Sequence, residues 1–134
     1  MTLTIDIWSD VACPWCLIGK RRFEAALAAF PFRDQVRVVY HSYVLDPDLP
    51  DRYEGTEEQY LAERKGLAPA QVRRMLDQVG EQAASVRLTY DWDHLVVASS
   101  LPAHRLLHGA RRLDEEDATG GVQAAADGDG GRRA

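Results

Sequence analysis

Two cysteines, the only two in the 134 residues, are the side chains best suited to chemistry. They stand at Cys13 and Cys16, separated by Pro14 and Trp15. If a helix begins at Cys13 or Pro14, the two thiols share one face, because residues three apart are neighbours on a helix, and a disulfide can close between them. The spacing therefore predicts reversible disulfide chemistry.

The start of a helix favours an anion, since its first N–H groups are unpaired and the helix dipole is positive there. We therefore expect Cys13 to be the exposed, attacking thiol, with a pKa below the value of about 8.5 for a free cysteine. Cys16, one turn further on, is expected to be the buried resolving thiol. Pro14 suits the first helical turn because it has no N–H to satisfy. Pro14 and Trp15 are the predicted substrate-binding residues, with Trp15 as an apolar rim for an unfolded or peptide-like substrate.

A β-α-β unit is expected to position the cysteines. Apolar and polar residues alternate over 3–8, which predicts a strand that ends at a Ser-Asp turn. Apolar residues recur at helical spacing over 16–30, and alternation over 35–43 predicts a second strand. A strand, helix and strand in this order give two parallel strands with a right-handed crossover. A Cys-x-x-Cys in this setting is typical of a thioredoxin-like α/β fold.

The middle of the chain is predicted to be helical. Thr56 and Gln59 form a capping box at the start of one helix, and Gly66 ends it. A second helix begins near Pro69, and its buried face is predicted to consist of Val72, Met75, Leu76, Val79, Ala83 and Val86.

A further helix, capped by Ser99 or Ser100, is expected to run to about Leu107. From Gly109 the composition changes to glycine, alanine, arginine and acids. Such a segment buries too little apolar area to offset the entropy of ordering it, so it is predicted to be mostly disordered. An extension of the preceding helix by a few turns, through Arg111 to Asp117, is the alternative for its first residues. The predicted organisation is therefore a thioredoxin-like βαβ over 1–46, a partial helical insertion over 47–108 and a disordered tail over 109–134.

Composition and charge exclude several partners. The net charge is −5 and no basic run is interleaved with aromatic residues, so we expect no nucleic acid. No apolar run approaches the roughly 20 residues that cross a bilayer, and the N-terminus lacks the positive region of a secretory signal. We therefore expect no membrane partner and a cytoplasmic protein, a compartment in which a cysteine pair is more often catalytic or metal-binding than structural.

The cysteines lie in a run, IDIWSDVACPWC followed by LIGK, that resembles the DsbA-like oxidoreductases of the FrnE type. These form a thioredoxin-superfamily branch with a helical domain inserted into the fold. The resemblance continues through HSYVLDP at 41–47 and AHRL at 103–106. It implies a thiol-disulfide oxidoreductase or isomerase with Cys13 as nucleophile and Cys16 as resolving thiol. Its substrates would be proteins or peptides with thiols or disulfides, and glutathione is a further candidate partner. No cofactor and no metal are expected.

The chain departs from this family in two respects. Members usually carry Gly where Arg87 stands, at a helix end with positive φ, and Arg costs about 1 kcal/mol more there. The family's later strands, its cis-proline loop and its closing helix are not found, so we expect a product truncated after about residue 108 and frameshifted in its tail. A two-stranded parallel sheet leaves its edges bare, which predicts marginal stability or dimerisation through those edges.

Other functions remain open. His104 and His108, four residues apart, could complete a zinc site with Cys13 and Cys16. The glutathione-dependent isomerases and kappa-type transferases share the fold, although they usually carry Ser at the first cysteine position. A truncated chain without activity is the last alternative. Asp6 could accept the proton of Cys16 during exchange, but we favour a position in which it faces water.

Overall fold

The structure is a computed structural model that describes residues 1–113. The predicted tail from residue 114 onward lies outside the described residues. Contacts divide the described chain into two compact units, residues 1–45 with 100–113 and residues 46–99. The first of these units therefore includes residues 100–108, which the sequence predicts to belong to the helical insertion.

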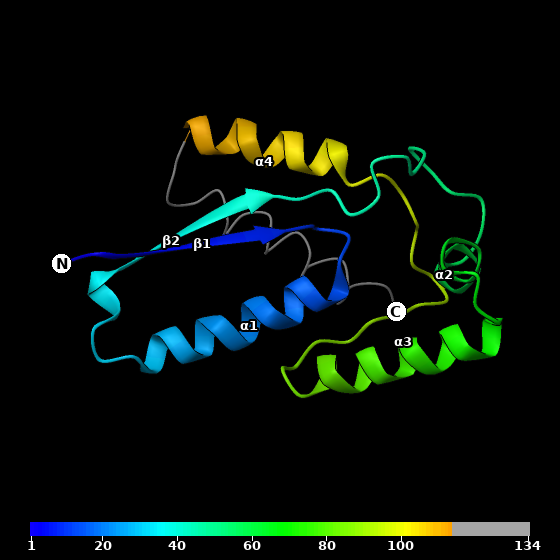
Figure 1. Ribbon diagram of the computed structural model, residues 1–134, viewed down its shortest axis with the longest axis horizontal. Helices are drawn as coiled ribbons and strands as arrows, with labels where there is room; N and C mark the ends of the chain where they lie inside the picture. Colours follow the sequence, from blue (N-terminus) through cyan, green and yellow to red (C-terminus); the bar gives the residue numbers. More distant parts are fainter. Residues whose placement is uncertain (114–134) are drawn as a thin grey trace. The chain divides into compact units, whose positions relative to one another are not determined.

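The first unit begins with the expected β-α-β arrangement (Figure 1). Its elements are β1 (Leu3–Ser9), α1 (Pro14–Ala29), the short 3-10 helix η1 (Arg33–Gln35) and β2 (Val36–Ser42). The two strands are parallel, in a register that pairs Leu3 with Val36 and Ser9 with Ser42. The predicted α/β, thioredoxin-like fold class is confirmed by this start and by the helices that follow.

Local signals set the limits of α1. Cys13 occupies the N-cap position with extended dihedrals, φ −93° and ψ 113°, and Pro14 is the first helical residue. Its fixed φ is already helical, so it favours this start. The helix stops at Phe30, which is again extended (ψ 125°). Phe30 precedes Pro31, and the residue before a proline is sterically disfavoured in the helical region.

Helix α4 (Leu101–Leu113) completes the first unit and is longer than expected. The extension of this helix into the predicted tail is confirmed for residues 109–113, which are helical, so the tail does not begin at Gly109. Ala110, Arg111 and their neighbours are good helix formers, and one glycine inside a helix costs only about 1 kcal/mol. Figure 1 shows α1 and α4 flanking the strand pair.

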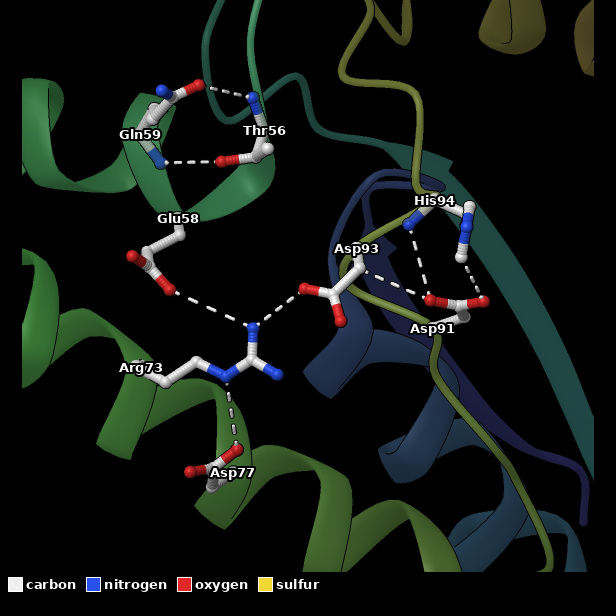
Figure 2. Close-up of polar contacts among 8 residues, drawn as sticks. All are labelled: Thr56, Glu58, Gln59, Arg73, Asp77, Asp91, Asp93 and His94. Carbon is white, nitrogen blue, oxygen red and sulfur yellow. Dashed lines mark hydrogen bonds and ion pairs between the residues drawn. The ribbon is translucent and has the colours of Figure 1, made fainter.

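The second unit contains α2 (Glu57–Lys65) and α3 (Pro69–Ala84). The predicted capping box is present: Thr56 Oγ1 accepts the N–H of Gln59 at 3.2 Å, and Gln59 Oε1 accepts the N–H of Thr56 at 2.9 Å (Figure 2). Gly66 ends α2 in the left-handed region, with φ 63°. The predicted buried face of α3 is confirmed at Val72, Leu76, Val79 and Ala83.

Two members of the predicted apolar face behave differently. Met75 is 38% exposed, and Val86 lies beyond the last residue of α3. The helix ends in a Schellman motif, in which Leu88 N–H donates to Ala83 O at 2.9 Å and Arg87 N–H to Ala84 O at 3.1 Å. Arg87 has φ 63°, so the predicted positive φ at this residue is confirmed.

Arg73 of α3 links three segments of the second unit (Figure 2). Its guanidinium Nη1 lies 2.8 Å from Asp93 Oδ1 and 3.8 Å from Glu58 Oε2, and its Nε lies 3.6 Å from Asp77 Oδ1. The partners come from α2, from α3 itself and from the turn at 91–94. These ion pairs are exposed, so each contributes little to stability, and their main effect is to fix the turn against α3.

The second unit is closed at its base by backbone hydrogen bonds. Tyr53 N–H donates to Val97 O at 2.8 Å, and Ser99 N–H donates to Pro50 O at 3.0 Å. The segment that opens the unit therefore runs beside the segment that ends it.

Candidate functional site

The cysteines lie at the junction of β1 and α1, as predicted. The strand ends at Ser9, a turn covers residues 11–12, and Cys13 precedes the first residue of the helix. Cys13 N–H donates to Asp10 O at 3.1 Å, and Cys16 N–H donates to Cys13 O at 3.1 Å. The backbone that bears both thiols is thus hydrogen-bonded from Asp10 to Cys16.

Both thiols are free, and they hydrogen-bond with each other. We expected an exposed Cys13 and a buried Cys16. The structure corrects this expectation, because both side chains are half-buried. Two thiols in contact on one helical turn are suited to forming a disulfide with each other.

The expected low pKa of Cys13 is also wrong. Burial of the thiol and the hydrogen bond and charge of the Cys16 sulfur raise the pKa of Cys13 to about 11. The backbone N–H groups of Cys16 and Trp15 act in the opposite direction. Burial and the Cys16 sulfur outweigh them, and the Cys13 side chain makes no capping hydrogen bond. The helix start is present, but it does not by itself hold a thiolate.

Apolar residues precede and separate the cysteines in the sequence, and an apolar cavity reaches Cys16. Trp15 is 49% and Val11 46% exposed, while Pro14 is half-buried. A cavity of about 290 Å³ reaches Cys16, and it is lined by Ile5, Ile7, Trp8, Ser9, Gly19, Lys20, Phe23 and Tyr40.

A buried carboxylate that sequence reasoning missed lies just before the cysteines. Asp10 Oδ2 accepts the N–H of Leu45 at 2.8 Å, and Asp10 Oδ1 accepts the N–H of Ala12 at 3.2 Å and a hydrogen bond from His104 Nε2 at 2.9 Å. Burial alone would raise the pKa of Asp10, but these bonds and one from the Ser100 side chain lower it. The only sequence signal was an acid directly after a strand, which also fits an ordinary turn.

The structure does not bring together the zinc ligands considered above. His104 Nε2 is bonded to Asp10, and His108 Nε2 lies 3.0 Å from Ser42 Oγ. Among residues 1–113, no three His, Cys, Asp or Glu side chains are grouped so that they could hold a metal ion. Within the same range, no helix is long and apolar enough to span a membrane.

Asp6, the other candidate acid, faces water as favoured above. Its side chain is 43% exposed, and its Oδ1 lies 2.7 Å from His41 Nε2. The His41 ring in turn stacks on Trp8, with ring centroids 4.6 Å apart. This exposed pair is therefore a feature of the sheet surface.

Known proteins resemble this chain in sequence and in fold. The family of DSBA-like thioredoxin domains matches residues 4–125. The chain is also similar to the crystal structure of a probable DsbA oxidoreductase from Streptomyces coelicolor, with 42% sequence identity and a TM-score of 0.74 over 81% of this chain. It spans 47% of that protein, about half of its length. No curated protein matches the chain.

Proposed function

The chain belongs to the family of DSBA-like thioredoxin domains, and from this premise we propose that it exchanges disulfides with protein or peptide substrates. One observation carries the proposal: the free thiols of Cys13 and Cys16 contact each other at the junction between β1 and α1. The similarity to a probable DsbA oxidoreductase supports the same reaction class. We further propose that the chain is of the FrnE type.

The proposed reaction passes two electrons between the chain and its substrate. The Cys13 thiolate attacks one sulfur of a substrate disulfide, so that a bond from Cys13 to the substrate forms and the substrate S–S bond breaks. The sulfur that leaves takes up a proton. The Cys16 thiolate then attacks the Cys13 sulfur, which releases the second substrate thiol and leaves a Cys13–Cys16 disulfide. The reverse sequence oxidises a substrate dithiol.

The groups around the thiols suggest how a substrate is held. We propose that Pro14 and Trp15 contact the substrate backbone and its apolar side chains, because both lie between the cysteines in the sequence and Trp15 is 49% exposed. Glutathione, which carries one thiol, is a further candidate partner for this chemistry.

Trapping of the mixed disulfide tests the assignment of roles. Cys16→Ser removes the resolving thiol, so after its Cys13 thiolate attacks an insulin disulfide the mixed disulfide should accumulate, visible on non-reducing gels and by mass spectrometry. Cys13→Ser is the matched control and should accumulate none. Adducts of equal amount in both variants would reject the assignment, and a wild-type chain that neither reduces insulin nor reshuffles disulfides would reject the proposed function.

A further inference from the structure

The described part of the first unit buries more polar than apolar side chains. Ile18 is its one buried hydrophobic residue, whereas Asp10, Ser100 and His104 are all buried. The side chains of Asp10 and His104 are only 2% and 4% exposed. A carboxylate out of contact with water is costly unless it is paired and hydrogen-bonded, so this group needs an explanation of its own.

Asp10 fixes the turn that leads to the cysteines at two points. Its side chain accepts the N–H of Ala12, and its backbone oxygen accepts the N–H of Cys13. Any rotation of Asp10 would therefore shift the turn and, with it, the sulfur of Cys13. The same carboxylate also accepts the N–H of Leu45, just after β2.

His104 holds this carboxylate from α4, 94 residues further along the chain. An ionised carboxylate can only accept, so His104 Nε2 is the donor. The other ring nitrogen, Nδ1, is buried and has no hydrogen-bond partner among the described residues. An orphaned polar atom costs stability. An apolar side chain would avoid that cost, so the histidine is explained by the single bond that it donates to Asp10.

We infer that Asp10 and His104 are positioning residues, whose buried hydrogen bond holds the turn that sets the Cys13 sulfur beside Cys16. The consequence for catalysis rests on the proposed function. In the resolving step, Cys16 attacks the Cys13 sulfur of a mixed disulfide, the new S–S bond forms, and the partner leaves as a thiolate that is then protonated. This step depends on the separation and angle of the two sulfurs, and small displacements of reacting groups cost rates of about ten- to a hundredfold.

Two variants with amide side chains distinguish the effect of the hydrogen bond from His104 to Asp10 from the effect of burying a polar side chain at position 104. In His104→Gln the amide nitrogen reaches the place of Nε2 and can still donate to Asp10, whereas the shorter side chain of His104→Asn does not reach it. Each reduced variant is mixed with oxidised glutathione, quenched with acid, and followed by mass spectrometry from mixed disulfide to closed disulfide. We expect closure to slow about tenfold in His104→Asn and to stay within about threefold of wild type in His104→Gln.

His108→Asn is the control, because it makes the same substitution on the same helix outside the pair, and its closure rate should equal that of wild type. Equal closure in wild type, His104→Gln and His104→Asn would overturn the inference, as would equal slowing in both His104 variants. If His104→Asn does not fold, Ser100→Ala tests the inference instead, since it removes another hydrogen-bond donor to the Asp10 carboxylate. Slower closure would then support the inference and unchanged closure would overturn it. Glutathione closure does not require substrate activity, so a chain inactive on insulin would reject only the proposed function.

Discussion

The surroundings of the Cys13 thiol favour its protonated form. Burial and the neighbouring sulfur of Cys16 raise its pKa, and two sulfurs that share one site cannot both ionise easily. Sequence reasoning identified the pair and its place at the helix start, because these are local features. It could not predict the pKa, since that depends on how deeply the two side chains pack.

The pH dependence of thiol alkylation tests this pKa. A thiolate with a pKa of about 11 is scarce at neutral pH, so the iodoacetamide rate at Cys13 should rise about tenfold per pH unit from pH 7 to pH 10. In Cys16→Ala the neighbouring sulfur is absent, so the titration should move to lower pH. A rate at Cys13 that is already constant below pH 8 in the wild-type chain would contradict the prediction.

The raised pKa of Cys13 also predicts a low reduction potential for the Cys13–Cys16 disulfide. DsbA is a strong oxidant because its reduced form is stabilised, with a potential of about −120 mV, whereas thioredoxin lies at about −270 mV. A Cys13 thiol with a raised pKa has no such stabilised thiolate. We expect a potential closer to that of thioredoxin, measured by thiol labelling after equilibration in glutathione buffers. A value above about −180 mV, the potential of protein disulfide isomerase, would contradict this.

The elements were predictable where the signals were local. Alternation over β1, the Thr56–Gln59 box and the proline after Phe30 each depend on a few neighbouring residues, and the structure contains all three features. The end of α4 was harder to place, because composition, rather than helical spacing, decided where the predicted tail begins. The hydrogen bond from His104 to Asp10 was missed for a different reason, since no local pattern joins residues 94 apart.

The end of α3 offers a stabilising substitution. Arg87 has φ 63°, a conformation in which a side chain costs about 1 kcal/mol relative to glycine. Arg87→Gly should therefore raise the free energy of unfolding by about 1 kcal/mol in urea titrations. Gly66→Ala is the matched control, because Gly66 also has φ 63°, and it should lower that free energy by a similar amount. A destabilised Arg87→Gly would show that the arginine side chain contributes more than its backbone strain.

The Asp10 carboxylate should make the fold sensitive to acid. Its pKa is lowered in the folded state, so its contribution to stability is complete above the unfolded pKa of about 3.9 and is lost as pH falls through the folded value. Asp10→Ala leaves buried donors unpaired and should cost about 3 kcal/mol at pH 7. The difference from wild type should shrink below pH 4. The exposed Asp51→Ala serves as the control, and a difference that stays constant to pH 2 would contradict the prediction.

For the whole chain, we propose that unpaired strand edges control stability and association. Among residues 1–113 the sheet has two strands, and Leu3 and Trp8 on β1 are 55% and 62% exposed. Bare apolar edges favour pairing with another chain. We expect either a melting temperature below about 60 °C or a dimer in sedimentation experiments. Leu3→Lys should weaken such a dimer, while Met75→Lys on α3 should not. A monomer that melts cooperatively above about 60 °C would contradict the proposal.

Two backbone hydrogen bonds, between Pro50 and Ser99 and between Tyr53 and Val97, hold the two ends of the intervening segment together. Lengthening a loop costs only about 0.6 kcal/mol per doubling once its ends are held together. Residues can therefore be added to or removed from the middle of this segment while its two hydrogen-bonded ends stay at the same distance from each other. A change in the length of this segment can thus leave the turn that carries the thiols unaltered.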